Sequence, residues 1–390
     1  MLIFHQCGHN YVWNIHSLSE DDAGNGFIIS PVNIRANQIS TKFPQKLLNS
    51  SWLDPQFYLP NDNKGKLATY PFFPANALDM FSTSDYEESA YEVAKQCLLF
   101  QHGLGLKYLV IPTRYFDDLP SNYLEQLSAL FLEPFAKAKK DLGLDKPLLL
   151  TVIAKSLHLE LGEPRDELLS WATNHPEIAG IYLILDNNFH SKQIKDPGYL
   201  VGAMRFIRIL RINNLEVHVG YSGLEGLLFS VADPTSVSIG SYENLRSFNI
   251  QRLETRDESS NPRQPRPRIY SGHLLQWIED TYLPSLRELT PEWQSFFDDS
   301  PYKNYLLDPS TSLNSQRSEL YKHYFLSFSK QVAALPALEQ RAQFIRKIVM
   351  EALARFEQIK ESGVFLNSDS DASHLPAWLN ALTMYQRQSE

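Results

Sequence analysis

The sequence predicts an α/β fold: a (β/α)8 barrel of the TIM type, with an N-terminal extra strand segment and a C-terminal helical extension. Three observations favour it. Eight short apolar or β-branched segments alternate with helical patterns. The segments are nearly continuous in apolar character, as expected for a parallel sheet covered by helices. Eight such units are the number that closes a barrel. An open doubly wound sheet is the alternative, but its G-x-G-x-x-G fingerprint is absent.

The expected strands are bounded by turn residues and separated by amphipathic stretches. They are Gly26–Val32, Trp52–Tyr58, Lys107–Arg114, Leu148–Lys155, Gly180–Asp186, Leu215–Gly220, Ser236–Ser241 and Arg268–Ser271. Apolar residues at helical spacing predict helices over Glu87–Gly103, Asn122–Leu142 and Tyr199–Asn213, and short helices over Tyr242–Phe248 and His273–Tyr282.

Three regions follow from this pattern. Residues 1–25 form a strand-like extension, residues 26–282 form the barrel, and residues 283–390 form a helical C-terminal region. In the last region, long amphipathic patterns predict helices over Gln316–Val332, Ala337–Ser362 and Pro376–Gln386.

Composition and charge indicate the cellular location of the protein and the classes of partner that it binds. The chain has 390 residues, two cysteines and a formal net charge of -9. This acidic balance argues against general binding to nucleic acid or anionic membranes. The start MLIFHQ lacks a signal-peptide pattern, and no apolar run approaches the ~20 residues that span a bilayer. We therefore expect a cytoplasmic protein without a membrane partner.

Alternation along the strands predicts which side chains point into the barrel. Thr151, Ile153 and Lys155 should point inward, whereas Val152 and Ala154 should face the helices. The same reasoning places Asp54, Gln56, Arg114, Tyr182, Asp186 and His218 inside. Because barrel active sites lie at the carboxyl ends of the strands, the candidate catalytic residues are Lys155, Asp186, Asp54 and Arg114.

Lys155 and Asp186 are the first choice as acid–base or nucleophilic partners, and Asp54 and Arg114 would orient the substrate. The alternative is a set of structural ion pairs in a polar barrel centre. His218 is interpreted as a hydrogen-bonded core histidine.

Two glycine–serine turns predict a phosphate site. Gly240 and Ser241 follow the seventh expected strand, and Ser271 and Gly272 follow the eighth. Many barrels bind a phosphate at these two strand ends, where backbone N–H groups converge. Strand-to-helix turns also favour such residues for purely local reasons.

The segment Asn61–Ser84 follows the second expected strand and so lies on the mouth side of the barrel. Its lysines and aromatic residues, Lys64, Lys66 and Phe72 among them, are typical either of a lid that closes over substrate or of a surface loop held by its aromatic side chains.

Two further patterns are weaker. His5, Cys7 and His9 alternate along one strand face, but their spacing matches no strong metal motif, and we expect neither a metal nor a cofactor. The run Asn261–Arg268 is basic and proline-rich; it reads as an extended linker, with a contact for a partner or nucleic acid as the alternative.

No nucleophile elbow, P-loop, HExxH or paired CxxC motif is present. The run VHVGYSGLEGLLFSVADPTSVSIGSYENLR is similar in layout to the corresponding stretch of tRNA-guanine transglycosylase barrels. That family's catalytic aspartate has no counterpart, since Gly240 and Ser241 stand there, and its zinc-binding cysteines are missing.

These patterns favour a barrel enzyme that acts on a phosphate-bearing small molecule or nucleotide, with lyase- or transferase-type chemistry. Whether the chain is an enzyme stays open. Two other functions remain: a non-catalytic barrel that binds a protein partner through its C-terminal helices, and a nucleic-acid-processing barrel whose substrate passes Lys64 and Lys66.

Overall fold

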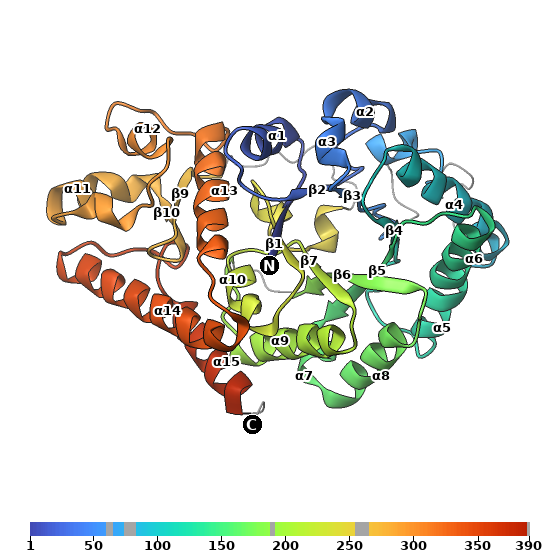
Figure 1. The fold of residues 1–390 in the computed structure, drawn as a ribbon. Coiled ribbons are helices and arrows are strands. Elements are labelled where there is room, and N and C mark those ends of the chain that lie inside the picture. The colour runs from blue at the N-terminus through green and yellow to red at the C-terminus, as the bar shows by residue number, and fades with distance from the viewer. Residues whose placement is uncertain (60–64, 74–82, 188–191, 254–264, 388–390) are drawn as a thin grey trace.

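Eight parallel strands form a nearly closed barrel in the computed structural model, as the sequence predicts (Figure 1). The structure describes residues 1–59, 65–73, 83–187, 192–253 and 265–387. The sheet order is β3-β2-β1-β8-β7-β6-β5-β4. The strands are β1 (Leu2–Gln6), β2 (Gly26–Ile29), β3 (Trp52–Leu53), β4 (Leu109–Ile111), β5 (Leu148–Lys155), β6 (Ile178–Asp186), β7 (Glu216–Gly220) and β8 (Ser236–Ile239).

The barrel closes between β3 and β4, which contact each other without a strand ladder. Backbone hydrogen bonds lie on either side of this seam, from Lys107 N to Ser51 O at 2.9 Å and from Tyr115 N to Tyr58 O at 3.0 Å. The two bonds hold the end strands of the sheet together, so the carboxyl ends of all eight strands face one mouth.

The identity of one barrel strand differs from the prediction. The N-terminal segment is not extra: β1 pairs in parallel with both β2 and β8. Arg268–Ser271 is not a barrel strand. It is β9, and it pairs antiparallel with β10 (Gln276–Glu279), where the sequence predicted a helix. The chain reverses within a few residues after β9, with Leu275 at φ 51°, and so short a connection cannot lead to a parallel neighbour.

The predicted alternation along the strands is confirmed. Ile153, Tyr182 and Ile184 belong to the cluster of side chains inside the barrel, whereas Val152 and Ala154 belong to the outer core beneath the helices. The inner cluster is rich in aromatic rings, and the outer one in aliphatic side chains.

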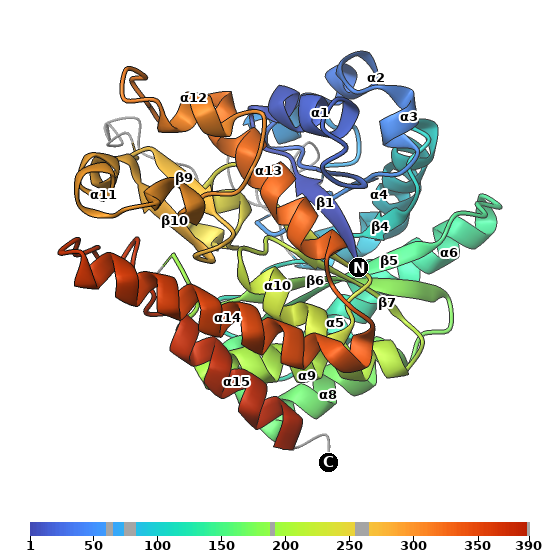
Figure 2. The ribbon, with the colours of Figure 1, turned by 60° about the vertical axis from the view of Figure 1, so that its left-hand side comes forward.

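Helices cover the outside of the sheet (Figures 1 and 2). Most predicted helices are present within a few residues of their expected bounds. In α9, the Asp196 carboxylate caps the helix by accepting from Gly198 N at 2.7 Å and Tyr199 N at 3.1 Å. The helices from α1 to α10 are α1 (Tyr11–Ser19), α2 (Ile39–Lys42), α3 (Gln45–Leu48), α4 (Thr83–Gly103), α5 (Tyr123–Leu127), α6 (Glu133–Asp141), α7 (Ser156–Glu160), α8 (Gly162–Thr173), α9 (Pro197–Ile212) and α10 (Glu225–Phe229).

The C-terminal region is helical and packs on one side of the barrel (Figure 2). Helix α13 contacts β9 and α1, and α15 contacts α9 and α14. Within the described part of the chain, no helix combines the length and apolar character needed to cross a bilayer. The elements are α11 (Leu283–Leu289), α12 (Lys303–Leu307), α13 (Ser318–Ala333), α14 (Leu338–Glu361) and α15 (Leu375–Arg387).

Candidate functional site

A buried carboxylate, Asp54, lies at the carboxyl end of β3 among three tyrosine hydroxyls. Tyr58 donates to it at 2.8 Å, Tyr221 at 3.2 Å and Tyr182 at 3.3 Å. The backbone N–H of Gln56 adds a fourth bond at 3.1 Å. Asp54 is 1 % exposed, so these donors take the place of water around it.

Burial raises the pKa of Asp54 to about 6, although the hydrogen bonds from Tyr58, Gln56 and the other tyrosines act in the opposite direction. A carboxyl group with this pKa holds and releases a proton near neutral pH. General acid–base catalysis requires this property, and an ordinary surface aspartate lacks it.

A pocket of about 100 Å³ opens next to this group, at the carboxyl ends of β2, β3, β7 and β8. Gln56 and Tyr221 both line the pocket and both bond to Asp54, so they connect the buried carboxyl to the open space. Its lining residues are Ser30, Val32, Asn33, Gln56, Tyr221, Asn244, Leu245, Phe248, Asn249 and Leu253.

The two connecting residues have a left-handed backbone, with φ of 57° at Gln56 and 48° at Tyr221. Non-glycine residues rarely adopt this conformation, and it costs of order 1 kcal/mol each. The Gln56 amide holds the pair in place: Nε2 donates to Tyr221 Oη at 3.0 Å, and Oε1 accepts from Val32 N at 2.9 Å. This geometry fixes the Tyr221 hydroxyl between Asp54 and the pocket.

Lys155 and Asp186 meet on the opposite side of the mouth. They are direct partners in the β5–β6 register. The Tyr115 hydroxyl donates to Asp186 at 2.8 Å, and the Lys155 ammonium lies 4.4 Å from the centre of the Tyr115 ring. Lys155 also donates to the carbonyl oxygens of Phe116 and Asp117. Burial lowers its pKa, and nearby aspartates, Asp186 first among them, oppose this effect.

Phe248 joins the two sides. It comes from the segment after β8, and its ring centre lies 5.3 Å from that of Tyr58, 5.5 Å from that of Tyr221 and 6.0 Å from that of Tyr115. The structure thus brings Asp54, Asp186 and Lys155 to one mouth. An aromatic layer lies between the Asp54 side and the Lys155 side.

Arg114 and His218 lie apart from the Asp54 pocket. The Arg114 guanidinium lies 5.3 Å from the centre of the Phe116 ring, beside a small cavity that Lys155 also lines. His218 is fully buried between Ser236 Oγ at 2.8 Å and Glu216 Oε2 at 3.0 Å. It is the hydrogen-bonded core histidine that the sequence predicts.

The two predicted phosphate turns have other local partners. A Cβ at Gly240 would lie 2.3 Å from that of Leu245, so the following turn requires glycine there. Ser241 is buried, and its hydroxyl has no partner among the described residues. Gly272 N donates to the Asp298 carboxylate at 2.5 Å, and Ser271 Oγ bonds to Phe296 O. Because β9 lies outside the barrel sheet, its turn does not complete a pair of adjacent barrel loops. The phosphate site stays a prediction.

The predicted lid is only partly within the described residues, which leave out Lys64. Lys66 Nζ donates to Asn33 O at 2.7 Å, at the end of the pocket that Asn33 lines. Phe72 is buried and packs against Phe57, Tyr70 and Phe100. Phe72 therefore anchors its segment to the core.

The side chains of His5, Cys7 and His9 contact other residues of the protein or are buried. His5 Nε2 bonds to Ala23 O at 2.6 Å and Nδ1 to Asn14 at 3.1 Å, while the His9 ring stacks on Tyr242 at 5.2 Å. Cys7 is buried, and burial raises the pKa of its thiol. Among the residues that the structure describes, no three metal-binding side chains cluster.

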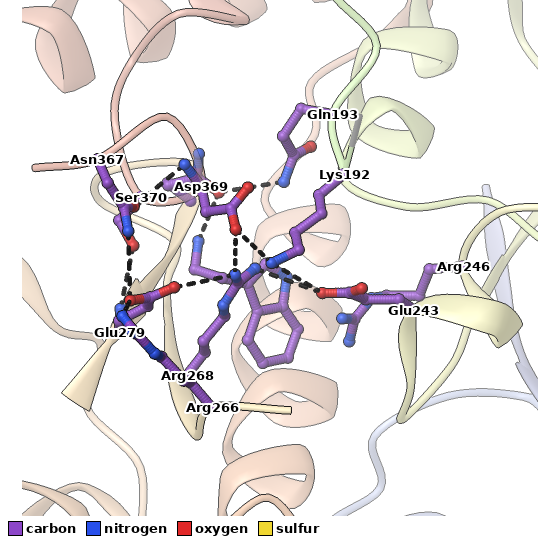
Figure 3. Close-up of polar contacts among 12 residues, drawn as sticks. Lys192, Gln193, Glu243, Arg246, Arg266, Arg268, Glu279, Asn367, Asp369 and Ser370 are labelled. Atoms are coloured by element: carbon purple, nitrogen blue, oxygen red, sulfur yellow. Dashed lines mark hydrogen bonds and ion pairs between the residues drawn. The ribbon is translucent and has the colours of Figure 1, made fainter. Parts of the chain in front are cut away.

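Of the basic run, residues 261–264 lie outside the described part of the chain, whereas Arg266 and Arg268 lie inside it. These two arginines belong to an ion-pair network. Arg268 donates to Glu279 at 3.1 Å and Asp369 at 2.9 Å, and Arg266 to Glu279 at 3.0 Å (Figure 3). Lys192, from the loop after β6, joins Asp369 at 2.6 Å. The network ties the hairpin and the C-terminal segment to the loops at the barrel mouth.

Sequence reasoning missed the tyrosines that surround Asp54. Tyr182 was expected inside the barrel, but Tyr58 and Tyr221 were not singled out. The available signal was their position near strand ends at the mouth: Tyr58 lies 4 residues after Asp54, and Tyr221 directly follows Gly220, the last residue of β7.

Comparisons with known proteins add no functional information. No family model matches the sequence, and no curated protein is significantly similar to it. Among solved structures, the chain is similar to a dihydrodipicolinate synthase from Oceanobacillus iheyensis, with 9% identity, a TM-score of 0.26, and coverage of 79% of this chain and 80% of that one. So low a TM-score carries no argument. The barrel fold rests on the strand order, and the candidate function rests on the geometry of the site.

Proposed function

We propose that the chain is a barrel enzyme that binds an uncharged polar ring, such as the sugar or base of a nucleotide, in the Asp54 pocket and transfers a proton to or from it. The observation that carries the proposal is the connection from buried Asp54 through the Tyr221 hydroxyl to a pocket at the catalytic end of the barrel.

The pocket lining supports an uncharged ligand. Its described residues carry hydroxyl and amide groups but no charged side chain. The Asn244 amide and the Nδ2 of Asn249 make no hydrogen bond within the described part of the chain, so both are available to a ligand. Val32, Leu245 and Phe248 add apolar contacts to the lining, against which a sugar or base can pack.

The proton path follows from the hydrogen bonds. Tyr221 donates to ionised Asp54 and accepts from Gln56. When Asp54 is protonated, its O–H can donate to Tyr221, whose own proton then turns toward the pocket. Because the pKa of Asp54 is about 6, both protonation states are populated near neutral pH.

The alternative functions differ in what the barrel binds and in whether the bound molecule reacts. The proposal includes a phosphate on the substrate and chemistry of the lyase or transferase type. Lys155 and Asp186, on the far side of Phe248, are the groups that would contact the rest of the substrate. A non-catalytic barrel is the second candidate. Phe248 favours it because its ring packs against three tyrosines across the mouth and so fills space that a substrate would need.

The test combines binding and turnover. Purified protein is incubated with defined nucleosides, nucleotides and sugar phosphates; ligand-observed NMR reports binding, and mass spectrometry reports conversion. We expect one class to bind and to react. Tyr221→Phe should keep binding within a few-fold and abolish turnover, since it removes the proton path but keeps the ring.

Tyr108→Phe is the matched control, because Tyr108 also lies inside the barrel but bonds to Glu216 rather than to the pocket. It should leave turnover unchanged. Binding without turnover would support the non-catalytic barrel, and an absence of binding across the panel would overturn the proposed site.

A further inference from the structure

A second pocket, of about 250 Å³, lies between α13, α14 and the turn that joins β9 to β10. It shares no lining residue with the Asp54 pocket. Helices α13 and α14 diverge from a short connection, and the hairpin lies across the open side between them (Figure 1). The pocket is therefore a three-sided recess in the C-terminal region.

Part of the lining of the recess is apolar. Phe344 and Ile348 come from α14, and Ala334 comes from the end of α13. Ser327, on α13, also lines the pocket; it is 1 % exposed, and its hydroxyl has no partner among the described residues. A buried hydroxyl without a partner is unfavourable, so a ligand that bonds to it would gain affinity.

The lining also carries both signs of charge. Arg355 and Lys330 supply positive groups, and Asp298 and Glu351 supply negative ones. The guanidinium of Arg355 contacts His273 O at 3.3 Å and Glu351 at 4.0 Å through the same nitrogen, Nη1. Within the described residues its Nε and Nη2 make no hydrogen bond, and these two groups match the geometry of a carboxylate.

Hydrogen bonds hold the Gly272 wall of the recess in place. Gly272 N donates to Asp298 Oδ2, and Gly272 O accepts from Gln331 Nε2 at 3.0 Å. A Cβ at Gly272 would lie 2.6 Å from Asp298 Oδ1 and 2.9 Å from Gln331 Nε2. The bare glycine thus lets the Asp298 carboxylate sit close to the backbone, at a fixed place on the pocket wall.

From this arrangement we propose that the recess binds a free α-amino acid with an apolar side chain. A simple anion would face Asp298 and Glu351, and a simple cation would face Arg355 and Lys330. A zwitterion satisfies both sets, with its carboxylate on Arg355, its ammonium on the carboxylates of Asp298 and Glu351, and its apolar chain against Phe344 and Ile348. This proposal is independent of the one for the barrel mouth.

The experiment is calorimetric titration of the full chain with L-leucine as the probe. Two comparators lack one charge each: 4-methylpentanoate lacks the ammonium, and isopentylamine lacks the carboxylate. We expect leucine to bind and each comparator to bind at least about tenfold more weakly, because each leaves one charged wall unmatched. Equal binding of either comparator, or no binding of leucine, would overturn the proposal.

Variants locate the site. Arg355→Ala should weaken leucine binding at least about tenfold. The control Arg346→Ala lies on the same helix but contacts Thr383 and Gln386, so it should leave binding unchanged. Ser327→Ala should lower affinity while leaving the melting temperature unchanged or higher, since it removes a hydroxyl without a partner. Leucine binding that survives Arg355→Ala would place the amino acid elsewhere and refute this site.

Discussion

Replacing Asp54 with asparagine should remove a pH-dependent part of the folding free energy. The pKa of Asp54 is about 6 in the folded protein, against 3.8 for the free side chain, and burial is the cause. The folded state therefore binds this proton first as the pH falls. The resulting stabilisation is fully present below pH 3.8 and is lost as the pH rises through 6.

The magnitude follows from this difference in pKa. In full it corresponds to about 3 kcal/mol, and roughly half of this should appear between pH 8 and pH 5. Asparagine has nearly the same shape but does not titrate, so the variant should lack this gain. The free energy of unfolding of the wild type, relative to that of Asp54→Asn, should thus increase by about 1 kcal/mol or slightly more on going from pH 8 to pH 5.

The assay is urea unfolding of both proteins at several pH values, followed by circular dichroism. Comparing the two proteins at each pH cancels the titration of buried histidines, which both contain. A difference in stability that stays constant between pH 8 and pH 5, or that changes in the opposite direction, would refute the raised pKa and, with it, the role of Asp54 as a proton donor and acceptor near neutral pH.

Three further predictions concern the rest of the fold. Arg268→Gln should lower the free energy of unfolding in urea by about 3 kcal/mol, because it leaves Glu279, which is 3 % exposed, without its buried partner. Arg266 pairs with the same glutamate but is 66 % exposed, so Arg266→Gln should lower it by under about 1 kcal/mol. Equal losses for the two variants would contradict this account. Gly202→Ala should destabilise the protein by about 2 kcal/mol or more, since the new Cβ would lie 2.1 Å from Leu159 O. Gly162→Ala should be tolerated, because its Cβ would lie 3.7 Å from the nearest atom. Calorimetric melting of both variants measures the difference, and equal melting temperatures would contradict this prediction. His374→Gln should make acid unfolding between pH 6.5 and pH 4 less steep, because burial lowers the pKa of His374 to about 4 and the stability of its neutral form is lost as the pH falls; an unchanged slope would show that His374 does not contribute.

The sequence was sufficient for seven of the eight barrel strands and for the side of the sheet that most side chains face. Val152, Ala154 and Tyr182 illustrate why: inside and outside positions alternate strictly along a buried strand, and the outer positions must be apolar. The helices were predictable for a similar reason, since α9 and α14 carry apolar residues at helical spacing.

Strand pairing was harder to predict. Leu2–Gln6 and Arg268–Ser271 are both short apolar segments, and nothing within either shows which one pairs with β8. The partner of a parallel strand lies far along the chain, so its choice depends on the packing of the whole barrel.

The candidate site was predictable in its charged residues but not in its geometry. Asp54, Lys155 and Asp186 could be placed at the mouth because they end strands. The tyrosine hydroxyls around Asp54 and the position of Phe248 depend on the left-handed turns at Gln56 and Tyr221 and on the segment after β8. Neither turn contains a glycine at the strained position, so the sequence carries no local signal for it.

The most direct test of the proposed site is a crystal structure of the protein with the nucleoside or sugar that binds best in solution. The account predicts the ring of that ligand beside Phe248, with a polar atom within hydrogen-bond distance of the Tyr221 hydroxyl and another near the Asn244 amide. A ligand that occupies a different part of the molecule, with the Asp54 pocket empty, would contradict it.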